Sequence, residues 1–542
     1  MRIPTLSLIA LLLPAAATAQ TAADRAAGTI TADRLFAHTR FLSDDRLEGR
    51  GPASEGEALA QMYIAAQLEA EGLEPAGEDG SWLQGFDLVG LTVPAPAALA
   101  AAGPEGSLSF AWREDWIASP GRQEGHSALE DLEVVFVGYG IVAPEEAWDD
   151  YGDTDVAGKV LLFLNNDPTG DRFAGDVRLY YGRWSYKYEI AAEKGAAGAL
   201  VIHTTPSAGY GWNVVQSSWS GTQYELPAGD EPRTEVEGWM TEDAARRLVA
   251  LGGHDLDALT AAAQDPSFEA VPLGVTVSTA FDSDLRRTAS ANVIGRLPGS
   301  DPVLSKEHVL FTAHYDHLGV GEPVDGDSIH NGARDNALGT ATLLALARAY
   351  AALPDRPARS LLFAAVGAEE QGLLGSAWLA REPVIPNCDI VANLNMDGGN
   401  IWGVTTDVRQ VGRGKSDLDR LLDRHAEAAG RRVLAEEFPD KGYFYRSDQF
   451  SFAKVGIPAI YLDEGVEFVG RPDGWGEERI EEWLAEDYHQ PSDEVTPDWD
   501  LSGAVEDARL LFRVGLDVAG SPDRPAWTPG DEFEATRLAC DS

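Results

Sequence analysis

Residues 313–341 read AHYDHLGVGEPVDGDSIHNGARDNALGTA, and this stretch decides which fold the chain can adopt. Residues 307–313, just before its loop, are mostly apolar and short enough for a buried parallel strand. Residues 336–350 repeat apolar side chains at helical spacing, and Asp335 stands near the expected helix N-cap. A strand, a polar loop and a helix in this order are typical of α/β folds, in which ligand-binding side chains lie at the carboxyl ends of strands. The polar side chains that this stretch brings there are His314, Asp316 and Asp335.

Other predicted strands also end in side chains that bind metal ions. Residues 360–367 run into the neighbouring pair Glu369 and Glu370, and residues 390–396 lead to Asp397. Far downstream, His489 follows Tyr488. Nitrogen and carboxylate donors without a thiolate suit zinc, or a harder ion such as manganese, and argue against a structural zinc site built on cysteine.

The number of donors favours two ions over one. Five ligands exceed what one tetrahedral ion takes, and a shared carboxylate would let two ions divide them. Two ions roughly 3.5 to 4 Å apart can hold a water between them, lower its pKa and polarise a carbonyl oxygen. Because Glu369 and Glu370 are adjacent, their side chains should diverge, so that one binds metal and the other moves a proton.

Six motifs, in order along the chain, resemble those of the co-catalytic zinc exopeptidases. That family includes bacterial secreted aminopeptidases, glutamate carboxypeptidase and the transferrin receptor ectodomain. The motifs are HYDHLG (314–319), GARDNALGTA (332–341), GAEEQGLLGS (367–376), NMDGG (395–399), RSDQFSFAKVGIP (446–458) and YHQPSDE (488–494).

The resemblance implies a role for each candidate residue. It assigns His314 and Asp397 to one zinc ion, Glu370 and His489 to a second, and Asp335 to a bridge between them. It further implies that Glu369 is the general base, that Asp316 orients His314, that Tyr488 hydrogen-bonds the tetrahedral oxyanion and that Arg446 contacts substrate.

Four nearby residues do not follow the family pattern as ligands. Gln449 stands where relatives often have His, and Leu338 where they often have Ser, so both bear on substrate preference more than on chemistry. His317 and His330 match no ligand position, and we interpret them as loop residues.

The composition limits the possible partners. The 542 residues exceed what one hydrophobic core usually supports, so two or three domains are expected. With 88 acidic and 42 basic residues, the formal net charge is -46, which repels nucleic acid and anionic lipid. We therefore expect no nucleic-acid partner, while the resemblance to zinc exopeptidases implies a peptide substrate and the sequence does not indicate an oligomeric state.

The first 19 residues are typical of a secretory signal peptide. Arg2 precedes an apolar run over residues 6–13, and Ala17-Thr18-Ala19 is a small-residue cleavage site. The run is too short to span a bilayer, and no later run approaches transmembrane length, so we expect an exported protein in the periplasm or outside the cell. Cys388 and Cys540 are the two cysteines, and either a disulfide or two free thiols is compatible with the sequence.

We place the domain boundaries where the residue pattern and the composition of the sequence change. Residues 125–273 have strand patterns of their own, and GYGIVAPEEAWDDYGDTDVAGKVLLFLNNDP with KYEIAAEKGAAGALVIH resembles the protease-associated domain. Residues 94–106, rich in Ala and Pro, indicate a boundary loop. The expected parts are a signal peptide (1–19), an N-terminal part of the peptidase domain (20–124), the insert (125–273), the main part (274–520) and a C-terminal strap (521–542).

Together the patterns predict an α/β fold with a mostly parallel, mixed central sheet flanked by helices and a smaller β-rich inserted domain. The resemblance implies an exported dinuclear zinc exopeptidase, with aminopeptidase activity favoured. A carboxypeptidase or dipeptidase, in which Arg446 holds a free carboxylate, is an alternative, as is a non-catalytic, receptor-like binding protein. A one-zinc glutaminyl cyclase shares the fold but leaves the full set of donors unexplained.

Overall fold

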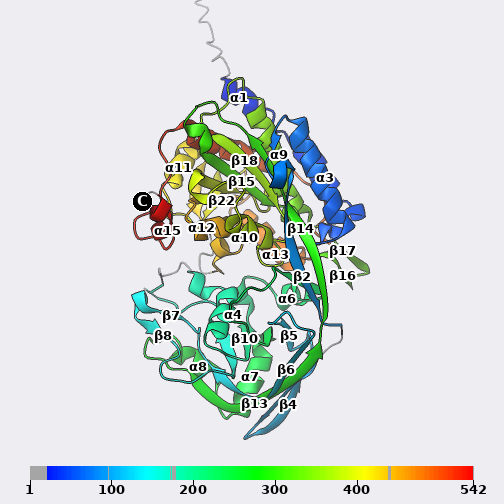
Figure 1. Cartoon of the computed structure of the whole chain (residues 1–542), viewed down its shortest axis with the longest axis vertical. Helices are drawn as coiled ribbons and strands as arrows, with labels where there is room; N and C mark the ends of the chain where they lie inside the picture. The colour runs from blue at the N-terminus through cyan, green and yellow to red at the C-terminus, as the bar shows by residue number, and fades with distance from the viewer. Residues whose placement is uncertain (1–20, 95–96, 171, 174–178, 437–440, 541–542) are drawn as a thin grey trace, which may run out of the picture.

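The computed structural model describes residues 21–94, 97–170, 172–173, 179–436 and 441–540. The predicted signal peptide, residues 1–19, lies outside the described residues. Figure 1 shows two sheets one above the other along the long axis of the molecule. No helix in the described ranges has the length and apolar character needed to cross a membrane.

The first sheet has ten strands within the described residues, in the order β11-β2-β14-β18-β15-β19-β22-β20-β21, with β1 paired to β14. The central strands β18, β15, β19 and β22 run parallel, and the outer pairs β14–β18 and β20–β22 are antiparallel. The sheet is mixed, as expected, with parallel strands at its centre, and the predicted strands before His314, the Glu369–Glu370 pair and Asp397 are confirmed. The bounds are β1 (Glu74–Pro75), β2 (Leu83–Thr92), β11 (Thr222–Glu225), β14 (Asp284–Leu297), β15 (His308–His314), β18 (Ser360–Val366), β19 (Ile390–Asn395), β20 (Asp407–Val411), β21 (Arg432–Ala435) and β22 (Ala459–Asp463).

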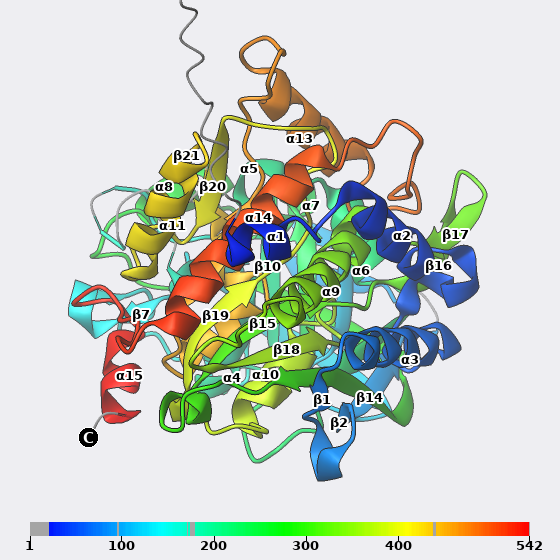
Figure 2. The ribbon, with the colours of Figure 1, turned by 90° about the horizontal axis from the view of Figure 1, so that it is seen from above.

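Helices cover both faces of this sheet. Figure 2 shows α9 and α14 lying across β15, β18 and β19, and one hydrophobic core joins them with α2 and α3. A separate core packs α10 and α12 on the other face. Every residue of β15 and β18 is buried, as expected for strands covered on both faces. The helix bounds are α2 (Ala32–Leu42), α3 (Glu55–Ala70), α9 (Leu338–Ala351), α10 (Leu374–Arg381), α12 (Gln449–Lys454) and α14 (Ser502–Gly520).

The second sheet has eight strands within the described residues, in the order β4-β3-β13-β6-β9-β10-β12-β5. Residues 125–273 supply β6, β9, β10 and β12, but β3, β4 and β5 precede residue 125, and β13 continues to Asp282. The loop expected over residues 94–106 is wrong in part, because β3 forms there and pairs with β4 and β13. The bounds are β3 (Leu99–Gly103), β4 (Gly106–Phe110), β5 (Trp116–Pro120), β6 (His126–Phe136), β9 (Val160–Leu164), β10 (Gly198–His203), β12 (Val236–Thr241) and β13 (Val271–Asp282).

We call residues 99–282 the inserted stretch. Its strands enclose cores that are separate from those of the first sheet. The chain enters it after β2 and leaves it into β14, and these two strands pair antiparallel from Leu83 to Thr92. One segment returns: β11, from within the inserted stretch, pairs with β2 at the end of the first sheet. The inserted stretch is therefore joined to the first sheet through the strands before and after it and through the pairing of β11.

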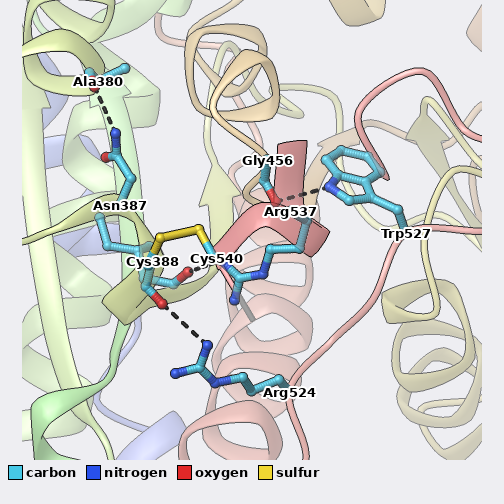
Figure 3. The surroundings of a disulfide bond; sticks show 9 residues. Ala380, Asn387, Cys388, Gly456, Arg524, Trp527, Arg537 and Cys540 are labelled. Atoms are coloured by element: carbon cyan, nitrogen blue, oxygen red, sulfur yellow. Dashed lines mark hydrogen bonds between the residues drawn. A yellow bond between two sulfur atoms is a disulfide. The ribbon is translucent and has the colours of Figure 1, made fainter. Parts of the chain in front are cut away.

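A disulfide between Cys388 and Cys540 settles the alternative that the sequence leaves open. Figure 3 shows it linking α15 (Glu534–Cys540) to the turn before β19. Arg537 donates to the Ile390 carbonyl oxygen at 3.0 Å, and Trp527 donates to that of Gly456 at 3.0 Å. The expected strap over 521–542 thus includes a helix that is covalently bound to the first sheet.

Candidate metal centre

The candidate ligands come from five separate loops and meet at one edge of the first sheet. His314 ends β15, and Asp397 follows β19. Glu370 lies in the turn after β18, and His489 follows α13 (Trp475–Glu486). Asp335 lies in a short π-helical turn, Ala333–Ala337, ahead of α9.

The distances divide these side chains into two adjacent groups. His314 Nε2 lies 3.1 Å from Asp397 Oδ1 and 3.3 Å from Asp335 Oδ1. His489 Nε2 lies 3.1 Å from Glu370 Oε2 and 3.4 Å from Asp335 Oδ2. The two carboxylate oxygens of Asp335 therefore face different histidines, which is the arrangement that a bridging ligand requires.

The chemistry of this cluster fits bound cations. Burial alone would lower the pKa of His314, but the carboxylates of Glu369 and Asp397 raise it well above its ordinary value. Burial, together with the Glu370 and Asp397 carboxylates, raises the pKa of Glu369 well above its ordinary value. Buried carboxylates in excess of cationic side chains are stabilised by metal ions, and imidazole and carboxylate donors suit zinc. His314, Asp335 and Glu370, and likewise His314, Glu369 and Asp397, are close enough for one ion.

Glu369 lies beside the ligands and is held by its backbone. Its Oε2 is 3.9 Å from His314 Nε2, and the side chain is 9% exposed at the cavity wall. The Asp316 carboxylate accepts hydrogen bonds from the amides of Glu369, at 3.0 Å, and Glu370, at 3.4 Å. His314 Nδ1 lies closer to the Asp316 carbonyl oxygen, 3.3 Å, than to its carboxylate, 3.9 Å. Asp316 thus contacts His314 Nδ1 through its carbonyl oxygen and holds the Glu369–Glu370 turn through its carboxylate.

Sequence reasoning missed two residues that support the ligands. His317, interpreted as a loop residue, is fully buried, and its Nδ1 lies 2.6 Å from Glu370 Oε1. Asp493 accepts hydrogen bonds from the amides of Arg334 and Asp335, both at 3.0 Å. Asp493 belongs to the motif that supplies His489, and His317 lies three residues after His314. Membership of the same loops as the ligands was the signal that could have identified them.

A cavity of about 460 Å³ opens onto this cluster between the two sheets. The inserted stretch contributes Arg183, Tyr210 and Ser218 to its wall, and Tyr488 and Arg446 line it from the other side. Burial raises the pKa of Tyr488 well above its ordinary value, so its hydroxyl keeps its proton and can donate a hydrogen bond.

Arg446 lies at the contact between the two parts of the chain. Its Nη2 donates to the carbonyl oxygen of Ala208 in the inserted stretch at 2.7 Å, and its guanidinium lies 4.9 Å from the Tyr443 ring. Gln449 and Leu338 are buried and do not line the cavity within the described residues, so the expected effect on substrate preference would have to be indirect. His330 is buried in β17 (Asp327–His330) and belongs to neither donor group.

Known proteins are similar to this region in sequence, and a solved structure is similar to most of the chain in fold. Residues 292–512 match the model of Peptidase family M28. A probable zinc metalloprotease of Leptosphaeria maculans is 37% identical over 208 residues, which cover 32% of this chain and 46% of that protein. An aminopeptidase of Mus musculus is 34% identical over 124 residues, covering 22% of this chain and 15% of that protein. The chain thus spans less than half the length of these curated relatives.

Among solved structures, an aminopeptidase from Aneurinibacillus sp. strain AM-1 aligns with a TM-score of 0.55 at 19% identity. The alignment covers 94% of this chain and 98% of that one. At this identity the likeness shows the fold alone, and it confirms the expected α/β architecture with helices around a central sheet.

Proposed function

We propose that the chain is a zinc-dependent exopeptidase with a dinuclear site, on the premise that residues 292–512 match the model of Peptidase family M28. One observation carries the proposal: Asp335 offers one oxygen to the group around His314 and the other to the group around His489. His314 and Asp397 would hold one ion, Glu370 and His489 the other, and Asp335 both. When bound, two such ions supply Lewis acidity, which polarises a carbonyl oxygen and makes water a stronger acid.

The side chains around the ligands account for proton transfer and charge. Glu369 takes a proton from the attacking water and passes it to the leaving amine. Its carboxylate is available for this role because it lies beside the five proposed ligands and is not one of them. Tyr488 donates a hydrogen bond to the carbonyl oxygen as that oxygen becomes negative. Asp316 holds the backbone of Glu369 in place.

The size of the cavity supports cleavage at chain ends. A volume of about 460 Å³ is within the range for a small ligand, and the inserted stretch forms part of the cavity wall beside the ligands. An extended peptide would have to pass through that wall in order to be cut internally. Carboxylates of Glu436 and Asp463 line the same cavity and favour a substrate with a free ammonium group, as an aminopeptidase requires.

A second candidate, a carboxypeptidase or dipeptidase, is favoured by two arginines in the cavity. Arg183 and Arg446 both line it, and within the described residues no ion pair joins either guanidinium to a carboxylate. Such a pair suits a free carboxylate of the substrate. Amino-blocked and carboxyl-blocked dipeptides discriminate the two activities, because each blocks one of the two free ends.

Replacing Glu369 with glutamine tests the proposed reaction. Glu369→Gln keeps the size of the side chain and removes its base, so turnover should fall about 10²- to 10⁴-fold while zinc content stays near that of the wild type. The control is Glu322→Gln, in the exposed strand β16 (Gly319–Val324), which should leave both unchanged. Turnover of Glu369→Gln within a few-fold of wild type, with zinc bound, would remove Glu369 from the role of base.

A non-catalytic, receptor-like role is disfavoured because all five donors and Glu369 are present together. The receptor-like role would be favoured again if zinc-loaded protein cleaved none of a panel of free and blocked dipeptides.

Export is part of the proposal. Disulfides persist in oxidising compartments, and the Cys388–Cys540 bond supports that location. Protein recovered from the periplasm or medium should lack residues 1–19, which mass spectrometry of the N-terminal peptide measures directly.

A further inference from the structure

The candidate ligand His489 forms a hydrogen bond with a residue of the inserted stretch. Ser218 is the last residue of α6 (Trp212–Ser218), and its Oγ lies 2.8 Å from Nδ1 of His489. The other ring nitrogen, Nε2, faces Asp335 and Glu370. We propose that Ser218 is a positioning residue that orients His489 for metal binding; this inference rests on the proposed dinuclear site.

The proton positions follow from the chemistry of imidazole. A histidine that binds an ion through Nε2 carries its proton on Nδ1, and a hydrogen-bond acceptor at Nδ1 fixes both the tautomer and the orientation of the ring. The Ser218 hydroxyl is that acceptor. In the described part of the chain no other hydrogen bond to His489 Nδ1 is found. Its loss would leave an unpaired N–H group and a ring with less restraint.

The backbone of His489 increases the need for such a restraint. Its φ is 58°, in the left-handed region that side chains other than glycine rarely adopt. The surroundings therefore hold the residue in place. The Tyr488 ring packs on one side at a centroid distance of 4.0 Å, and the His317 ring meets it edge-on at 5.6 Å. Ser218 supplies the directional contact that these rings lack.

The helix that carries Ser218 is fixed to the second sheet. Trp212 Nε1 and Gln216 Nε2 both donate to the carbonyl oxygen of Arg113, at 2.7 and 2.8 Å. Val215 is buried in the core of the inserted stretch, and Trp219 meets the Trp184 ring edge-on at 5.8 Å. Helix α6 therefore connects the second sheet to His489, a candidate ligand in the part of the chain that is built on the first sheet.

A neighbouring contact shows the same connection at a second point. The amide of Tyr224, in β11, donates to Gln371 Oε1 at 2.9 Å, and Gln371 directly follows the candidate ligand Glu370. Two loops of the site are thus bonded to one short segment of the inserted stretch.

The test compares four variants of α6. Ser218→Ala and Ser218→Val remove the hydroxyl, Ser218→Thr keeps it, and Thr and Val have nearly the same size. Ser217→Ala is the matched control, since the Ser217 hydroxyl bonds back to Asn213 and Val214 carbonyl oxygens of its own helix. The readouts are zinc affinity, measured by chelator competition, and the visible absorption spectrum of the cobalt-substituted protein.

Ser218→Ala and Ser218→Val should bind one of the two ions about 10- to 100-fold more weakly and change the cobalt spectrum. Ser218→Thr and Ser217→Ala should match the wild type. Zinc affinity in Ser218→Ala and Ser218→Val within twofold of wild type would overturn the proposal, and so would an equal loss in Ser217→Ala. If Ser218→Ala does not fold, the Thr and Val pair decides.

These measurements are independent of peptide hydrolysis. Protein that binds zinc in a Ser218-dependent manner but cleaves no blocked or free dipeptide would refute the exopeptidase proposal and leave this one standing. Cleavage by Ser218 variants with unaltered zinc affinity would do the reverse.

Discussion

The disulfide between Cys388 and Cys540 should contribute strongly to stability without affecting the metal centre. The two cysteines are 152 residues apart, so the bond closes a long loop in the unfolded chain. The loop-entropy relation gives about 5 kcal/mol at 25 °C for a loop of this length. With an unfolding entropy of about 2.1 cal/mol/K per residue, this corresponds to a fall in Tm of roughly 5 °C if the whole chain unfolds in one transition.

The variant Cys388→Ser with Cys540→Ser removes the bond at nearly constant volume. It should still fold, because the hydrogen bonds from Arg537 to Ile390 and from Trp527 to Gly456 remain to hold α15 and its approach. Thermal unfolding is followed by circular dichroism at a fixed, saturating zinc concentration, since ligand binding itself raises Tm.

A reducing agent provides the internal control. It should lower the Tm of the wild type to that of the double variant and leave the double variant unchanged. A shift below about 1 °C would refute the reasoning from loop entropy. A double variant that also responds to reductant would show that the Tm change does not come from this bond.

Two further predictions concern single side chains. Burial and the nearby Glu225 carboxylate raise the pKa of Glu237 to about 8, above its ordinary value of 4.5, so folding favours the protonated form and this contribution to stability is lost as pH rises from about 4.5 to 8. The glutamine in Glu237→Gln does not titrate, so the free energy of unfolding of the variant, relative to that of the wild type, should rise by about 1.4 kcal/mol per pH unit over that window. Denaturant titrations at pH 5 and 8 measure this difference. A difference that is the same at both pH values would contradict the prediction. Asp316→Asn loses one of two acceptors for the Glu369 and Glu370 amides, so kcat should fall at least about 10-fold with KM little changed, and steady-state kinetics that show only a higher KM would be against it.

The central strands and the donors at their ends were predictable from sequence. Runs such as residues 307–313 and 360–367 are mostly apolar because both faces of β15 and β18 are buried. Parallel strands end at a common edge, so His314 and the Glu369–Glu370 turn had to lie near each other once the strands were recognised.

Asp335 shows where local pattern fails. Its place before an apolar helical run predicts an N-cap, but α9 has Ala337 at that position without a side-chain cap. Both oxygens of Asp335 face histidines, and Asp493 accepts its amide hydrogen bond. Contacts with residues distant in the sequence therefore determine the position of Asp335, and it does not cap the helix.

Contacts over long sequence separations left no local signal. Ser218 lies 271 residues from His489, and nothing in the composition of α6 marks it. The strand β3 lies in an Ala-rich segment of weak strand preference, and it forms because β4 and β13 pair with it.

The return of β11 to the first sheet limits how this chain can be shortened. β11 covers the outer side of β2, so the row of backbone amides and carbonyls on β2 is satisfied there. A minimal catalytic unit made by excising residues 99–282 would uncover that row along Val89 and Leu91, which offers a template for pairing with a second molecule. Removal of the inserted stretch would then lead to self-association, unless lysine or proline were placed on the free edge of β2.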